Sequence, residues 1–113
     1  MPVRILILHQ NFPGQYRHLV GALLARGDEV QAIGAPQAPG MAGVSCFHYN
    51  FPSGGAVPAV HPWAHDFQVK VFRAEAVLRL LSERSDQIVR PDLILGHPGW
   101  GELLGIKDHW GDV

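Results

Sequence analysis

The sequence lacks the features that would link it to an oxidising compartment, a nucleic acid or a membrane. Its 113 residues contain one cysteine, Cys46, which has no second cysteine for an internal disulfide. Nine basic and ten acidic residues give a net charge of −1, so no basic field attracts nucleic acid or anionic lipid. The apolar run Ile5 to Leu8 is far too short for a signal or transmembrane segment. We therefore expect a cytoplasmic protein with no nucleic-acid partner.

Glycine and proline are abundant, and they divide the chain into elements of secondary structure. The continuous aliphatic run Val3–His9 is typical of a strand buried on both faces of a parallel sheet. Apolar residues then recur at helical spacing from Gln15 to Arg26, and Gly27 follows as a C-terminal cap. Glu29–Ile33 reads as a second strand. This order predicts a βαβ unit.

The remaining chain continues the alternation of strands and helices. Val44–Tyr49 is a third strand of open direction: the short connection before it fits a hairpin more easily, although an extended crossover could span it. A long helix follows and ends before Pro91, and its apolar face is formed by Trp63, Phe67, Val71, Ala74, Leu78, Leu81 and Ile88. We expect Trp63 and Phe67 on this face to be core residues. Asp92–Gly96 is a further buried strand. A short last helix should turn Leu103, Leu104 and Ile106 inward. The pattern predicts an α/β, Rossmann-like three-layer sandwich with a mostly parallel sheet, incomplete at its end.

The first candidate site is the turn His9–Gln15, after the first strand. Ligands of open α/β sheets bind beyond the carboxyl ends of the strands, and a helix N-terminus there offers free amide donors to an anion. Pro13 and Gly14 could equally serve only to form the turn and begin the helix. The G-x-G-x-x-G fingerprint is absent, and no acidic residue ends the second strand, so we expect no NAD or FAD cofactor.

The second candidate site, His97–Glu102, directly follows the last strand. Gly99 and Gly101 flank Trp100 and impose a loop where ligands bind in this architecture. His97 could donate or accept a hydrogen bond there. The alternative is a rigid turn filled by Trp100, in which Glu102 serves only the dipole of the following helix.

Other polar residues give weaker signals. His61 and His65 are four residues apart, a spacing that can place two imidazoles on one helical face, but Pro62 lies between them and no third ligand is evident. We expect no metal site, and we interpret these histidines as solvated or capping residues. Cys46 lies in an apolar strand and is expected to be a core residue.

Two segments together resemble the N-terminal domain of a bacterial group of family 4 (group 1) glycosyltransferases. They are Arg4–Leu19 (RILILHQNFPGQYRHL) and Asp92–Glu102 (DLILGHPGWGE), and the passage Ala25–Val30 looks like the same family's connection to its second strand. The resemblance implies a GT-B architecture, in which two Rossmann-like domains face each other across a cleft. It also implies that the C-terminal domain holds most of the nucleotide-sugar donor, that the N-terminal domain mainly holds the acceptor, and that transfer needs no bound metal.

The resemblance also assigns roles to individual residues. His97 matches a histidine that typically contacts the transferred sugar, and is the expected catalytic residue. The expected substrate-binding residues are Pro13, Gly14, Gln15, Gly99, Trp100, Gly101 and Glu102. Residues 1–113 would then be a truncated N-terminal domain without its donor domain, inactive alone and inclined to self-associate. The acceptor is unknown.

A stand-alone flavodoxin-like binding or signalling module is the alternative function. A phospho-acceptor module needs an aspartate where this chain has His9, and a flavin module needs a Ser/Thr-rich phosphate loop where His9–Gln15 contains neither residue type. Both features weaken the alternative.

Overall fold

The computed structural model describes residues 2–51 and 60–113. In these residues, strands and helices follow in the order β1 (Arg4–Leu8), α1 (Arg17–Arg26), β2 (Glu29–Gly34), β3 (Ser45–His48), α2 (His65–Glu83), β4 (Leu93–Gly96) and α3 (Ile106–Trp110). Short 3-10 turns, Gly14–Tyr16 and Pro62–Ala64, lead directly into α1 and α2. Within the same residues, no helix combines the length and apolar content needed to cross a lipid bilayer.

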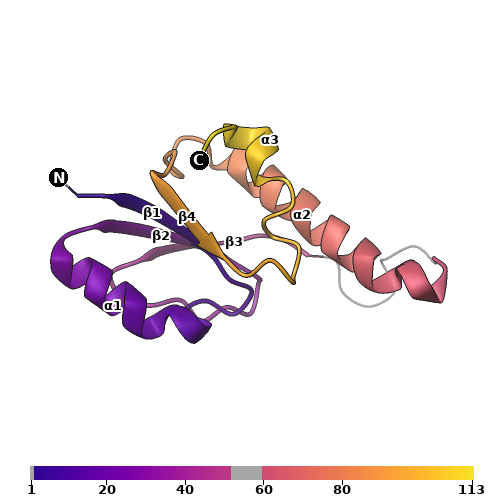
Figure 1. Cartoon of the computed structure of the whole chain (residues 1–113), viewed down its shortest axis with the longest axis horizontal. Helices are drawn as coiled ribbons and strands as arrows, with labels where there is room; N and C mark the ends of the chain where they lie inside the picture. Colours follow the sequence, from indigo (N-terminus) through magenta and orange to yellow (C-terminus); the bar gives the residue numbers. More distant parts are fainter. Residues whose placement is uncertain (1, 52–59) are drawn as a thin grey trace.

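The strands form one sheet in the order β3-β2-β1-β4, and every neighbouring pair is parallel. The first strand therefore lies inside the sheet, with β2 on one side and β4 on the other. Helix α1 covers one face, whereas α2 and α3 cover the other (Figure 1). The sequence-based prediction of an α/β Rossmann-like sandwich is confirmed.

The direction of β3, which the sequence left open, is parallel to β2. Its short connection contains no helix and crosses the α1 side of the sheet as an extended segment, where Ala38 is buried and Met41 packs against the core. Backbone hydrogen bonds from Ala38 to Ala35 and from Gly40 to Phe12 hold the segment down. A hairpin is avoided because this extended crossover takes the place of the usual crossover helix.

The continuous aliphatic run of β1 follows from burial on both faces of the sheet. Ile5 and Ile7 pack in the α1 layer, whereas Leu6 and Leu8 pack in the α2 layer. All four side chains are at most 4% exposed. Alternating residues of a strand point to opposite faces, so a strand buried on both faces has no polar positions.

Helix α2 departs from its predicted boundaries and burial. It ends at Glu83, and Ile88 reaches the core from the turn that follows. Its C-terminal half is buried on the sheet, but its N-terminal half extends past the strand ends (Figure 1). The prediction that Trp63 and Phe67 are core residues is therefore wrong: they are 94% and 64% exposed. Leu104 was also expected to point inward and is 55% exposed.

Candidate functional site

The two sequence motifs meet at the carboxyl edge of the sheet. His9 directly follows β1 and His97 directly follows β4, and these parallel strands are neighbours. Both histidines contact Trp100: His97 stacks on the indole with ring centroids 4.4 Å apart, and His9 meets it edge-on at 4.8 Å. Strand pairing thus brings together side chains that are far apart in the sequence, as the switch-point rule predicts.

His9 is a buried neutral histidine. Its Nδ1 atom accepts a hydrogen bond from the Asn11 N–H at 3.0 Å, so the single proton of the neutral ring resides on Nε2. Burial lowers the pKa of His9, and the nearby His97 acts in the same direction against the opposing charge of Glu102. At neutral pH, His9 therefore contributes one N–H donor and no charge.

The turn after β1 is shaped around the His9 ring. Gly14 has a φ of +47°, and a Cβ atom built on it would lie 2.7 Å from His9 Nε2. Pro13 is buried beneath the turn, whereas Gly14 and Gln15 are exposed. This packing explains why glycine occupies position 14 without invoking a ligand. The exposed backbone nevertheless faces the same edge as His97.

The loop after β4 fixes the His97 ring from two sides. The Gly99 N–H donates to His97 Nδ1 at 3.0 Å, so Nε2 carries the proton, and Trp100 stacks on the ring face at an interplanar angle of 18°. Gly101 has a φ of +101°, and a Cβ there would lie 2.8 Å from the Lys70 Cα. The loop therefore packs directly on the backbone of α2.

Glu102 lies beneath the surface of the site. It is 1% exposed, and its Oε2 atom accepts a hydrogen bond from Tyr49 Oη at 2.9 Å. Nor does it begin a helix, because α3 starts at Ile106. Burial, and then the Glu102 charge, raise the pKa of Tyr49, which keeps its hydroxyl protonated as a donor.

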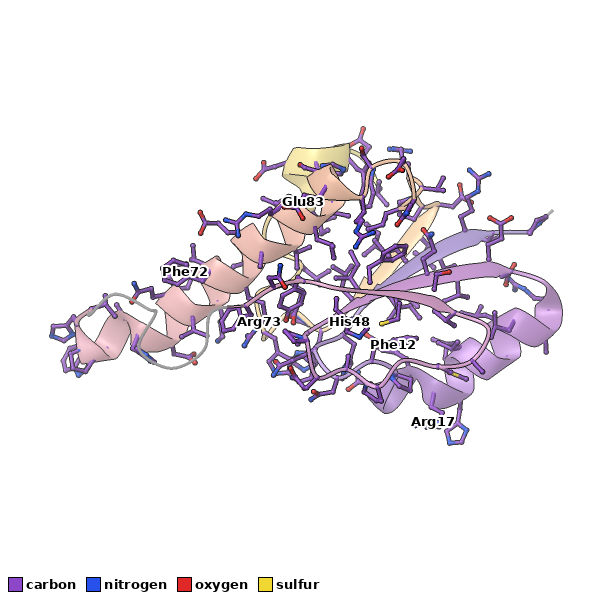
Figure 2. The ribbon with its side chains drawn as sticks, turned by 180° about the vertical axis from the view of Figure 1, so that it is seen from behind. Phe12, Arg17, His48, Phe72, Arg73 and Glu83 are labelled. Carbon is purple, nitrogen blue, oxygen red and sulfur yellow. The ribbon has the colours of Figure 1, made fainter. Side chains whose placement is uncertain are left out.

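Arg73 completes the site and was missed in the sequence. Arg73 lies near the middle of α2 (Figure 2). Its Nε atom lies 3.8 Å from Glu102 Oε2, its Nη1 atom donates to the Trp100 carbonyl at 2.6 Å, and its guanidinium lies over the Phe51 ring. A signal was present: Arg73 falls on the same face of α2 as the buried Ala76 and Leu80. A charged residue inside an apolar helical face indicates a buried partner.

The weaker candidates lie elsewhere. Among residues 2–51 and 60–113, no group of three potential ligands is placed to hold a metal ion. His61 and His65 are exposed, and His61 Nδ1 accepts a hydrogen bond from the Trp63 N–H, which caps the following turn. Cys46 packs against the α1-side core, where burial raises the pKa of its thiol.

Chemically, the site is a nearly neutral surface that offers polar donors beside an aromatic ring. The charge of Arg73 is opposed by Glu102, His9 is neutral, and each imidazole carries its proton on Nε2. Half-buried His97 and Trp100 form its accessible part. N–H donors combined with an aromatic ring suit a neutral hydroxylated ligand.

One comparison with known proteins identifies a family for this chain. Residues 26–113 match the model of the glycosyl transferase family 4 group, a span that includes the His97–Glu102 loop and begins after the His9–Gln15 turn. Neither a curated protein nor a solved structure matches the chain. The matched span is well over half of the sequence, and the resemblance seen in the sequence motifs is confirmed. The chain belongs to the glycosyl transferase family 4 group.

Proposed function

We propose that this chain is the acceptor-side, N-terminal domain of a cytoplasmic enzyme that moves a sugar from a nucleotide-sugar donor to an acceptor. Family membership supports the reaction class. The observation that carries the proposal is the His97–Trp100 stack at the carboxyl edge of the sheet, where open α/β folds bind their ligands.

In this proposal, His97 contacts the transferred sugar. Its Nδ1 atom is occupied by the Gly99 N–H, which leaves the Nε2–H as a donor to a sugar hydroxyl. Trp100 holds the ring in one orientation, so less conformational entropy is lost when the hydrogen bond forms. Gly99 and Gly101 contribute to substrate binding by setting the conformation of the loop. Glu102 contributes indirectly, because it is buried beneath the loop.

The turn Pro13–Gly14–Gln15 forms the neighbouring part of the same wall. The exposed backbone of Gly14 and Gln15 lies next to His9, at the start of the 3-10 turn that leads into α1. Amides at such a helical N-terminus can face a donor phosphate or the acceptor. The basic residue nearest to this turn along the chain is Arg17, the first residue of α1.

We further propose that transfer requires a second, donor-binding domain. Orientation of two bound substrates supplies a large share of enzymatic rate enhancement, and this wall can orient only one side of the reaction. A hydrogen bond from His97 contributes on the order of 1 kcal/mol net, too little to retain a free nucleotide sugar. The 113 residues alone should therefore bind acceptor weakly and transfer no sugar.

The test compares the 113-residue chain with the product of the complete reading frame. UDP-glucose and GDP-mannose are titrated into each by calorimetry, and donor hydrolysis is measured. We expect binding and turnover only with the longer product, and a loss of about fivefold or more in kcat/KM with His97→Ala. His109→Ala, which changes an exposed histidine of α3, is the matched control. Tight donor binding by the 113-residue chain, or unchanged kcat/KM in His97→Ala, would contradict the proposal.

A further inference from the structure

A buried polar cluster joins three segments of the chain beneath the candidate site. Glu102 comes from the loop after β4, Tyr49 follows β3, and Arg73 lies in the middle of α2. Tyr49 and Arg73 both approach Glu102 Oε2, at 2.9 and 3.8 Å. Because Tyr49 and Glu102 are 53 positions apart, the cluster is a tertiary feature and not a local turn.

The burial of Glu102 depends on Arg73. A buried carboxylate is strongly disfavoured unless a cation or several hydrogen bonds compensate for lost hydration. Arg73 is the cation that the structure places within 4.0 Å of Glu102, and its side chain is 14% exposed. Glu102 Oε1 accepts no hydrogen bond from any described residue, so the pairing at Oε2 provides the compensation.

Arg73 makes a second contact, which leads to the candidate site. Nη1 donates to the Trp100 carbonyl at 2.6 Å, and the Trp100 indole stacks on His97. The guanidinium therefore connects the buried carboxylate to the backbone that carries the stacked ring. A planar guanidinium can direct separate N–H groups at two acceptors, whereas a lysine ammonium is a single point of charge.

We infer that Arg73, held by Glu102, is a positioning residue that fixes the Trp100 backbone and through it the direction of the His97 Nε2–H. The inference rests on the proposed function only in taking His97 as the sugar contact. It explains why an arginine occupies the buried face of α2. It also replaces direct substrate binding by Glu102 with an indirect role.

The experiment reads the His97 ring directly by NMR of the 113-residue chain uniformly labelled with 15N, which also reports the backbone amides. The variants are Arg73→Lys and Arg73→Met, and the control is Arg79→Met, which removes an exposed arginine from the same helix. In the wild type and the control, we expect the ring nitrogens of His97 to report a single Nε2–H tautomer, and its Cε1 proton to be shifted upfield by Trp100. In both Arg73 variants, the tautomers should mix and the upfield shift should decrease.

Arg73→Lys separates positioning from stability. It keeps a positive charge opposite Glu102, so the amide spectrum of the sheet should remain native while the Trp100 contact is lost. Exchange of the Gly99 amide, which donates to His97, should then become about fivefold faster. Native His97 shifts and native Gly99 exchange in a folded Arg73→Lys variant would overturn the inference.

These readouts involve no sugar, so the two proposals fail separately. If the His97 signals respond to Arg73 but the complete enzyme is insensitive to His97→Ala, the positioning role stands and the sugar contact is wrong. If His97→Ala impairs transfer but the His97 signals ignore Arg73, the sugar contact stands and the positioning role is wrong.

Discussion

Gly14 lies against the imidazole of His9, so closely that the turn after β1 has no room for a side chain at this position. The His9 ring fills the space where a Cβ would stand, and the glycine backbone is left-handed, with a φ of +47°. Two independent reasons, packing and backbone conformation, thus require glycine here.

Replacing Gly14 with alanine should destabilise the protein by roughly 1 to 3 kcal/mol, because the new Cβ meets the buried ring and the left-handed backbone is strained. Gly21→Ala is the control: it changes a glycine inside α1 with nothing within 4 Å of its Cβ, and should stabilise by about 0.5 to 1 kcal/mol. Urea unfolding measures both. Equal changes in the free energy of unfolding for the two substitutions would show that the close contact between Gly14 and His9 does not affect stability.

The stability of the protein should decrease as the pH falls below about 6.5, through His9. Burial lowers the pKa of His9 in the folded state, so in this range the unfolded chain binds more protons than the folded one. Urea unfolding at about pH 7.5 and about pH 5.5 gives the difference for the wild type and for His9→Gln. The difference in unfolding free energy between the two pH values should be smaller in the variant, because His9 no longer titrates. It should not vanish, because the other titrating groups are retained. An identical difference in both proteins would rule out His9 as its source.

Removing the hydroxyl of Tyr49 should cost roughly 1 to 3 kcal/mol in the free energy of unfolding, because Tyr49→Phe deletes a donor to a buried carboxylate. Tyr16→Phe removes a hydroxyl from a half-buried ring that packs edge-on against His9, and should change stability much less. Thermal and urea unfolding of both variants provide the comparison. A neutral Tyr49→Phe would mean that Glu102 finds another donor.

The projecting end of α2 should promote weak self-association. Trp63, in the 3-10 turn that leads into this helix, and Phe67 and Val71, in the helix itself, recur every fourth residue. They are 94%, 64% and 40% exposed. Two such stripes bury on the order of several hundred Å² when paired, which is less than the roughly 1,200 Å² of a stable interface, so the association should be weak. Sedimentation velocity should show a concentration-dependent dimer that Trp63→Ser with Phe67→Ser abolishes. Leu19→Ser, on exposed α1, should not affect it. A monomer at every concentration would contradict this expectation.

Hydrophobic patterning predicted the positions of the strands and the first helix well, because those patterns reflect local geometry. The burial of the last strand was predicted wrongly: β4 lies at the edge of the sheet, and Leu93 is 46% exposed. β1 and β2 differ from their predicted ranges by one residue at most at either end, and Gly27 caps α1 through hydrogen bonds to Leu23 and Leu24, as expected. The same reasoning failed for Trp63 and Phe67. Periodicity identifies an apolar face of a helix, but it does not tell how far the sheet beneath that face extends.

The candidate site could be located from the sequence but not completed. Both motifs directly follow strands of a mostly parallel sheet, and the carboxyl ends of parallel strands share an edge. The roles of Arg73 and Tyr49 could not be predicted from the sequence, because Glu102 contacts them only after three separate segments have packed together. The pairing of Glu102 was misjudged for the same reason: from the sequence, its nearest feature was the following helix.

The parallel arrangement of β1 also determines when the site can form. β1 and β2 can pair once α1 has folded between them, whereas the backbone of Arg4 meets the Asp92 side chain across 88 positions of the chain. Closing so long a loop is slow compared with local pairing. During synthesis, β1 therefore keeps one edge unpaired, and the site at His9 stays incomplete, until nearly all of these residues have left the ribosome. The edge that later receives β4 is then the part of the nascent domain most in need of protection from other chains.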